Sequence, residues 1–140
     1  ALTHGKIVAA HAHGTEGIKF AIQAGVDSIE HASFLDKETI KLAKKMGTTF
    51  SMDIYNTEYT LSKGEENGVP DENINKEREV GTRQRESFTV AVNTGAKMVF
   101  GSDAAVYTHG DNAKQFYRMV KLGMTTIEPF KRPLLTRLSY

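Results

Sequence analysis

Short apolar runs alternate with segments of helical periodicity along most of the chain. Apolar runs bounded by glycine or polar residues are typical of buried strands, and they predict strands at residues 6–12, 26–32, 48–54 and 97–100. Residues 15–25, 36–46 and 111–123 instead place their apolar positions on one face of a helix, and a long helix is predicted over roughly residues 75–93. The chain therefore repeats a strand followed by a helix.

The expected helix ends carry residues that suit them. Thr15, Asp36 and Asp111 are predicted to cap the starts of three helices, and Gly25 and Gly47 stand where helices commonly end. Residues 56–73 are polar, contain glycine and proline, and show no apolar period. They predict a long loop, which could close over a pocket.

Strands that alternate with helices predict a parallel sheet with right-handed crossovers, an α/β fold. The pattern fits either a small open sheet or half of an eight-stranded barrel. In both cases the carboxyl ends of the strands meet at one edge of the sheet, which is where such folds place ligands.

Composition limits the classes of partner that the chain is expected to bind. The chain has 140 residues, a formal net charge of +1 and no cysteine. A balanced charge gives no reason to expect nucleic acid or an anionic membrane as partner. The absence of cysteine excludes disulfides and thiolate metal sites. No apolar run approaches the roughly 20 residues that span a bilayer, no signal peptide opens the chain, and the localisation is left open.

Each expected strand has a polar side chain at or near its carboxyl end. His11 and His13 belong to the first strand, His31 to the second and Asp103 follows the fourth, while the third leads into Asp53 and Tyr55. His11 and His13 are two residues apart, so in a strand they point to one face. Imidazole nitrogens with a carboxylate suit Zn²⁺ or a similar divalent ion.

Structural explanations exist for each residue alone. A single histidine in a strand is more often a hydrogen-bonded structural residue, and an aspartate at a strand end is often a helix cap. The recurrence on several strands favours a metal or polar catalytic site. Glu30 is expected to face away from His31, and His109 is equally compatible with a substrate contact and a loop hydrogen bond.

Three segments resemble a known family. VAAHAHG (residues 8–14), GVDSIEHAS (25–33) and MVFGSDAAVYTHG (98–110) look like the last strands of the metal-dependent amidohydrolase superfamily. The resemblance covers about residues 5–128 and points to the branch of imidazolonepropionase-like enzymes and metallo-dipeptidases, the prolidases and Xaa-Arg/Lys carboxypeptidases. Each motif alone is weak, but their order and separation are specific.

The resemblance implies a TIM-type (β/α)8 barrel with one or two divalent metals, usually Zn²⁺. It implies that His11, His31 and Asp103 are metal ligands from the fifth, sixth and eighth strands, and that Asp103 is also catalytic, as the proton shuttle of the attacking water. It implies that His13 contacts a metal ligand or the substrate. Tyr55, Tyr107 and His109 match loops that line the pocket and are expected to hold the substrate carboxylate or the scissile carbonyl.

The family's first-strand His-x-His pair and fourth-strand lysine have no counterpart in this sequence. Residues 1–129 are therefore expected to be the C-terminal half of the barrel, strands five to eight, and residues 130–140 an atypical basic tail. Both ends look like cuts. A half barrel exposes two strand edges, which predicts self-association.

Two functions remain in view. The first is a metal-dependent hydrolase, or a piece of one, that cleaves amide or peptide bonds, with dipeptides ending in proline, arginine or lysine as the substrates that the resemblance suggests. The second is a non-catalytic α/β binding module with structural histidines. Neither a glycine-rich phosphate loop nor a Gly-x-Ser-x-Gly motif occurs to support other chemistry.

Overall fold

A parallel four-stranded sheet organises the protein. The computed structural model describes residues 4–125, in which the strands are β1 (Ala9–Ala12), β2 (Ser28–His31), β3 (Thr49–Ser51) and β4 (Met98–Val99). They lie side by side in the order β1-β2-β3-β4, and each neighbouring pair is parallel. This confirms the predicted α/β fold and places consecutive strands next to one another, as in a (β/α) barrel.

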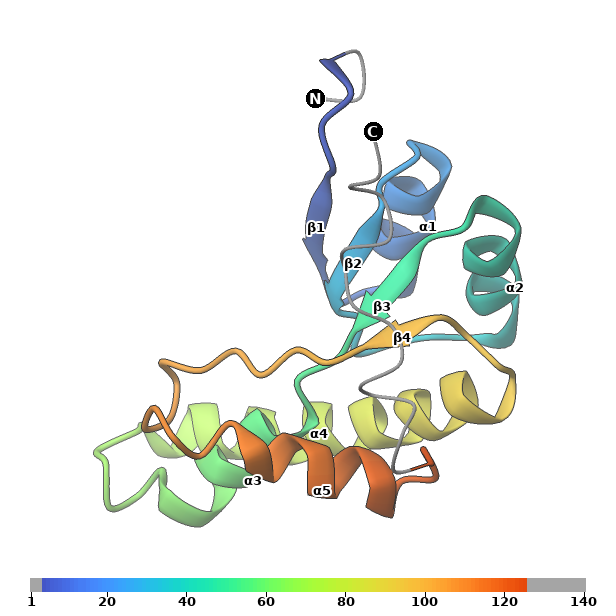
Figure 1. Cartoon of the computed structure of the whole chain (residues 1–140). Helices are drawn as coiled ribbons and strands as arrows, with labels where there is room; N and C mark the ends of the chain where they lie inside the picture. The colour runs from blue at the N-terminus through green and yellow to red at the C-terminus, as the bar shows by residue number, and fades with distance from the viewer. Residues whose placement is uncertain (1–3, 126–140) are drawn as a thin grey trace.

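The helices follow the strands in the chain. They are α1 (Thr15–Gln23), α2 (Lys37–Met46), α3 (Ile54–Lys63), α4 (Asp71–Asn93) and α5 (Ala113–Lys121). In Figure 1, α1 and α2 flank the first strands, whereas α3, α4 and α5 lie together beyond β3 and β4. Among residues 4–125, no helix combines the length and apolar character needed to cross a membrane.

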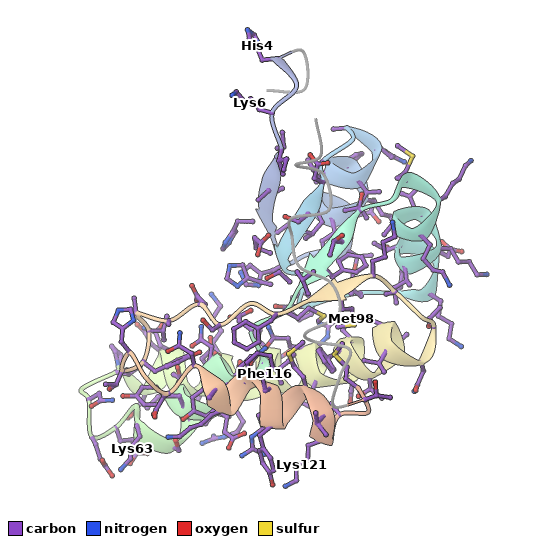
Figure 2. All side chains as sticks on the ribbon, viewed as in Figure 1. His4, Lys6, Lys63, Met98, Phe116 and Lys121 are labelled. Carbon is purple, nitrogen blue, oxygen red and sulfur yellow. The ribbon has the colours of Figure 1, made fainter. Side chains whose placement is uncertain are left out.

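One apolar core joins the sheet to these helices. It is built from residues of α1, α2, α4 and α5 and from the strand positions that face them, chiefly Ile18, Ile22, Ile29, Ile40, Phe50, Phe88, Met98 and Met119. Figure 2 shows Met98 between β4 and the helices, while Lys63 and Lys121 project outward. The shared core fixes the strands relative to one another, and with them the side chains at the strand ends.

The opposite face of the sheet carries polar residues. Ile29 of β2 is buried in the core, so its neighbours Ser28 and Glu30 lie on the other face. The Ser28 hydroxyl donates a hydrogen bond of 2.7 Å to Glu30 Oε1. This polar face corresponds to the inside of a barrel, and it leads to the edge at which the candidate site lies.

The predicted long loop at residues 56–73 is wrong. Helix α3 occupies residues 54–63, α4 begins at Asp71, and only residues 64–70 connect them. The α3 face that packs on α4 includes the polar Thr57, and α4 approaches it so closely that a Cβ at Gly81 would lie 1.9 Å from Thr57 Cγ2. Tertiary packing, rather than an apolar stripe, stabilises α3. The expected loop over the pocket is therefore replaced by most of α3, a short connection and the start of α4.

Helix α2 begins and ends as predicted. The carboxylate of Asp36 accepts a hydrogen bond of 2.6 Å from the Thr39 backbone N–H, and hydrogen bonding by Thr39 holds the pKa of Asp36 below its usual value. Gly47 ends the helix in the left-handed conformation, with φ 82°, which favours glycine.

The other two predicted caps are displaced. Gly14 is the N-cap of α1, and the Thr15 hydroxyl instead donates to the Phe34 carbonyl oxygen at 2.7 Å. Asn112 is the N-cap of α5, while the Asp111 carboxylate pairs with Lys114 at 2.7 Å. In both cases the side chain predicted to cap the helix forms a hydrogen bond or an ion pair with another residue instead.

Candidate metal centre

Four chemically active residues gather at the carboxyl ends of the strands. His11 lies in β1, His31 ends β2, Asp53 stands between β3 and α3, and Asp103 follows β4. Because the strands are parallel and adjacent, these ends lie at one edge of the sheet. The fold thus brings together residues separated by up to 92 positions in the sequence.

Three imidazoles form the first group of potential ligands. His11, His13 and His31 each offer a nitrogen, and these atoms lie within 4.8 Å of one another. The His11 and His31 ring centroids are 4.4 Å apart, and the His13 ring stacks on His31 with centroids 4.8 Å apart. His13 therefore stands among the possible metal ligands, in addition to its predicted contact role.

The second group joins His31 to two carboxylates. Ligand atoms of His31, Asp53 and Asp103 also lie within 4.8 Å of one another. His31 belongs to both groups, whereas His11 and Asp103 belong to different ones. The predicted ligand set of His11, His31 and Asp103 is thus distributed over two clusters that meet at His31, and Asp53 is an acidic member that the predicted set did not contain.

The backbone at the two central residues is unusual. His31 has φ 66° and Asp103 has φ 48°, values in the left-handed region that residues with side chains rarely adopt. Such conformations cluster at functional sites. In a regular strand Glu30 and His31 would face opposite sides, but the left-handed backbone breaks the alternation. The prediction that Glu30 faces away from His31 is therefore wrong, since both line one pocket.

That pocket opens at the strand ends. The residues that line it come from β2, from β3 and the segment after it, and from the segment after β4: Glu30, His31, Ser51, Asp53, Gly101, Ser102 and Asp103. Gly101 approaches β3 closely: a Cβ there would lie 2.0 Å from Ser51 Oγ, so a larger residue would displace the Ser51 side chain. The lining is strongly acidic, which suits a cation.

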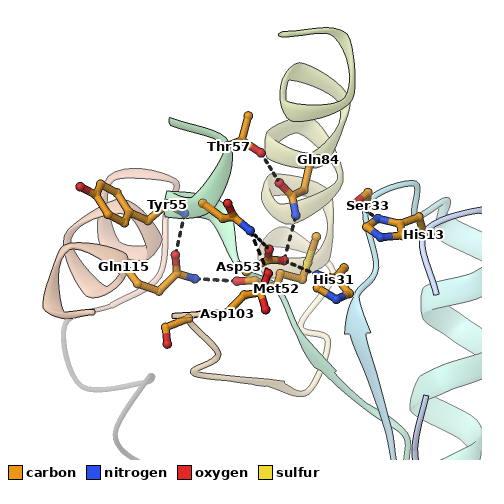
Figure 3. Close-up of polar contacts among 12 residues, drawn as sticks. His13, His31, Ser33, Met52, Asp53, Tyr55, Thr57, Gln84, Asp103 and Gln115 are labelled. Carbon is orange, nitrogen blue, oxygen red and sulfur yellow. Dashed lines mark hydrogen bonds and ion pairs between the residues drawn. The ribbon is translucent and has the colours of Figure 1, made fainter. Parts of the chain in front are cut away.

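Asp53 is the buried centre of the polar contacts. Only 6% of its surface is exposed, and its carboxylate accepts hydrogen bonds from His31 Nδ1 at 3.0 Å, Gln84 Nε2 at 3.2 Å and Asn56 Nδ2 at 3.1 Å. The same Asn56 amide also donates to Asp103 Oδ2 at 2.9 Å. Figure 3 shows Gln84 reaching Asp53 from α4, and His31 contacts the same carboxylate oxygen, Oδ1.

Protonation differs between the neighbouring histidines. The hydrogen bond to Asp53 raises the pKa of His31 above its ordinary value. Burial lowers the pKa of His13, and the nearby His31 and His11 rings lower it further. His13 Nδ1 also lies 2.8 Å from the Ser33 hydroxyl. The cluster therefore favours a proton on His31 and a neutral ring at His13, and a neutral ring can bind a metal.

The predicted substrate contacts occupy different surroundings. Tyr55 and Tyr107 are buried, with ring centroids 5.0 Å apart, and the Tyr107 hydroxyl donates to the Ser102 carbonyl at 2.6 Å. Burial raises the pKa of Tyr107. His109 is exposed. None of these three lines the described pocket, and their contact with substrate stays a prediction.

Sequence reasoning missed the supporting amides. Asn56 follows Asp53 by three residues, and this spacing is the one local signal that links them. Gln84 lies in α4, 31 positions beyond Asp53, inside a helix that otherwise reads as amphipathic. No pattern along the chain connects Gln84 with the strand ends. The contact arises only when α4 packs beside α3.

Comparison with known proteins identifies the lineage. The model of the amidohydrolase family matches residues 1–131, nearly the whole chain. The chain belongs to the amidohydrolase family. This confirms the predicted superfamily, whose members are generally metal-dependent. The boundary expected at residue 129 stays a prediction, and residues 130–140 lie outside the described residues.

Individual relatives of the chain support the same family assignment. Ochratoxinase from Aspergillus niger is 31% identical over 127 residues, which make up 90% of this chain and 26% of that protein. A crystal structure of a Xaa-Pro dipeptidase with methionine in its active site is 40% identical with a TM-score of 0.83, covering 92% of this chain and 33% of that one. A prolidase complexed with N-methylphosphonate-L-proline is 29% identical with a TM-score of 0.78, covering 92% and 31%.

The chain thus spans about a quarter of the curated relative and about a third of each solved structure. Its four adjacent parallel strands are part of the amidohydrolase barrel, as predicted from the sequence. The donor set fits a divalent cation, because imidazole nitrogens and carboxylate oxygens converge at one edge. His31 engages Asp53 through Nδ1, so Nε2 is the nitrogen left to bind a metal.

Proposed function

We propose that this amidohydrolase chain supplies part of the active site of a metal-dependent hydrolase that cleaves an amide or peptide bond in a small substrate. The observation that carries the proposal is that two further imidazoles and two carboxylates surround His31 at the strand ends. Family membership supports the same chemistry.

His11, His31 and Asp103 are the proposed metal ligands, with His13 near enough to join them. The mixture of nitrogen and carboxylate donors favours Zn²⁺ over Mg²⁺ or Ca²⁺, which prefer oxygen ligands. Such a metal, when bound, lowers the pKa of a water molecule and polarises the scissile carbonyl.

Asp103 is the proposed catalytic residue. Its carboxylate lies in the pocket and is oriented by the Asn56 amide at 2.9 Å. From that place it accepts a proton from the attacking water and returns it to the leaving amine. The left-handed backbone conformation of Asp103 turns its carboxylate toward the pocket.

Dipeptides with C-terminal proline are the proposed substrates, with C-terminal arginine or lysine as the second class. The likeness to a Xaa-Pro dipeptidase and to a prolidase that binds a proline phosphonate supports the first class. The proposed substrate contacts are four residues near the pocket. The His13 ring stacks on His31, Tyr55 follows Asp53 in the chain, and Tyr107 and His109 follow Asp103.

Self-association completes the proposal. β1 and β4 are the outer strands of the described sheet, so each has one hydrogen-bonded neighbour within residues 4–125. Strand edges of this kind pair readily with another chain. We therefore expect the chain to pair with a second copy, unless further sequence closes the barrel.

Native mass spectrometry of the full chain with Zn²⁺, before and after a chelator, tests the metal site. We expect about one or two metals per chain, lost in His31→Ala and Asp103→Asn and retained in the matched control His4→Ala, whose histidine is exposed and remote from the strand ends. Release of proline from Xaa-Pro dipeptides should follow metal content. A chain that binds no zinc, with folding unaffected by the chelator, would instead support the non-catalytic binding module.

A further inference from the structure

A buried polar network underlies the exposed part of the site. Its centre is Asp53, and its outer members are Gln84 on α4 and Asn56 on α3. Asp53 and Gln84 are 6% and 3% exposed. A buried carboxylate is unfavourable unless donors surround it, so each contact of Asp53 contributes to holding the group in place.

We infer that Asp53 is a positioning residue that, with Gln84 and Asn56, orients His31 and Asp103 for the metal before any metal binds. The inference rests on the proposed function and deepens it. It assigns a role to three residues that sit behind the proposed ligands.

The first arm of the network acts on His31. Asp53 Oδ1 lies 3.0 Å from His31 Nδ1 and, as a carboxylate, can only accept a hydrogen bond. The neutral imidazole must therefore carry its proton on Nδ1. This choice of tautomer leaves the lone pair on Nε2, and the hydrogen bond also fixes the plane of the ring.

The second arm acts on Asp103. The Asn56 side-chain amide donates to Asp53 Oδ2 at 3.1 Å and to Asp103 Oδ2 at 2.9 Å. One NH₂ group thereby joins the two carboxylates, which would otherwise repel each other. Since Asp103 is exposed, this bond is what ties its carboxylate to the buried part of the site.

The base of the network fixes Asp53 itself. The Thr57 hydroxyl donates to Gln84 Oε1 at 3.2 Å, so the Gln84 amide is turned with its NH₂ toward Asp53 Oδ1. Thr57 is packed against Gly81 of α4, which keeps the two helices close. The orientation of Asp53 therefore depends on the contact between α3 and α4.

A second glutamine provides a matched control. Gln115 of α5 is fully buried, and it contacts the residues on either side of Asp53, donating to the Met52 carbonyl at 2.6 Å and accepting from the Tyr55 N–H at 2.7 Å. Figure 3 shows both glutamines reaching the same turn from different helices. Of these two glutamines, Gln84 donates to the Asp53 carboxylate, whereas Gln115 contacts the backbone beside it.

The test reads the His31 tautomer in the metal-free full chain by ¹⁵N NMR at about pH 9, well above the ordinary histidine pKa of about 6.5. We expect the Nδ1–H form in the wild-type chain and a loss of that preference in Asp53→Asn, whose single acceptor oxygen cannot serve all three donors. Gln84→Leu should weaken the preference. Gln115→Leu should preserve it even where it lowers the melting temperature.

Zinc affinity, measured by competition with a chelator, is the second readout. Asp53→Asn should reduce it about 10- to 100-fold, the range seen when the partner of a ligating histidine is removed. Asn56→Ala should reduce it less and leave the His31 tautomer unchanged, because that variant breaks only the arm to Asp103. Circular dichroism checks that each variant is folded.

The inference is overturned if folded Asp53→Asn keeps both the Nδ1–H tautomer and a zinc affinity within about twofold of wild type, a change far below the expected one. It is also overturned if Gln115→Leu changes both readouts as much as Gln84→Leu, since packing alone would then explain the effect. Failure of the proposed function is distinguishable: the wild-type chain would bind no zinc while its tautomer still depended on Asp53.

Discussion

The two sides of the candidate site are held in different ways. His11 and His13 are exposed and come from the outer strand β1 and the residues after it, where they contact other imidazoles and the Ser33 hydroxyl. Asp53 is buried between β3, α3 and α4 and accepts three hydrogen bonds. The acidic side is thus organised by packing, whereas the imidazole side has few contacts that fix it without a metal.

The difference suggests an order of events. If His31 and Asp103 hold a metal as proposed, they would meet it already oriented, and the exposed His11 and His13 rings would be the ones left to adjust. Pre-orientation of part of a site reduces the entropy lost on binding. His31 is the residue at which the two sides meet, so changes there should have the largest effect.

Replacing His31, which belongs to both clusters, should have the largest effect on metal binding. His31→Ala removes a member of both clusters, whereas His13→Ala removes one member of the imidazole cluster alone. We expect His31→Ala to lower zinc affinity by more than the roughly 100-fold that a lost outer partner produces, and His13→Ala to have a smaller effect. Isothermal titration with Zn²⁺ measures both. Equal losses would show that the clusters act as one.

Packing beneath the acidic side is the next target. A Cβ at Gly81 would overlap Thr57, so Gly81→Ala should destabilise the fold by about 1–3 kcal/mol, as overpacking does. Gly17, within α1, has open space around its Cβ position. Gly17→Ala should instead stabilise by about 0.5–1 kcal/mol through helix propensity.

Chemical denaturation of the two variants tests this pair. The signs of the two changes should be opposite, although both substitutions add the same methyl group within a helix. If Gly81→Ala proved stabilising, the close contact between α3 and α4 would not exist. In that case the contact between α3 and α4 could not hold Gln84 and Asp53 in position.

Some features of the two sides of the site could be predicted from the sequence, and others could not. Periodicity predicted the strands, and the rule for parallel strand ends predicted that His11, His31 and Asp103 lie at one edge of the sheet, because both depend on local pattern. It missed α3 because Thr57, on the face that α3 turns to α4, is polar and packs against a glycine of another helix. It missed Gln84 because that contact joins positions 31 residues apart.

Glu30 illustrates a third kind of failure. Strand alternation placed it opposite His31, and alternation holds only while the backbone stays extended. The left-handed φ of 66° at His31 ends it. Nothing in the sequence signals that conformation at a histidine, because glycine is the residue that usually adopts it.

The pH dependence of the stability of the metal-free protein tests the effect of Asp53 on His31. The pKa of His31 is raised in the folded chain by its bond to Asp53, so the stabilisation is fully present below the unfolded pKa of about 6.5 and is lost as pH rises through the folded value. Wild type should therefore lose more stability between about pH 6 and pH 9 than His31→Gln. Zinc competes with the same proton, so its affinity should move oppositely and fall as pH falls.

Melting temperatures of wild type and His31→Gln across that range give the stability difference directly. A difference that stays constant with pH would show that the Asp53 bond does not favour the protonated ring. The matched double change, with Asp53→Asn added to His31→Gln, should remove any remaining dependence on this pair.

The smallest expected effect lies away from both sides of the site. Asp36 caps α2 through Thr39, and Asp36→Ala should cost about 1 kcal/mol of stability, whereas Asp36→Asn keeps a capping oxygen and should change little near neutral pH. The pKa of Asp36 is lowered, so its contribution is present above the unfolded pKa of about 3.9 and is lost as pH falls through the folded value.

The stability difference between wild type and Asp36→Ala should therefore narrow in acid, as urea denaturation at successive pH values would show. Zinc affinity should be equal in wild type, Asp36→Ala and Asp36→Asn, because α2 contributes no residue to either cluster. A loss of zinc binding in Asp36→Ala would mean that the clusters respond to the stability of the whole sheet. The buried network around Asp53 would then have no special role in orienting them.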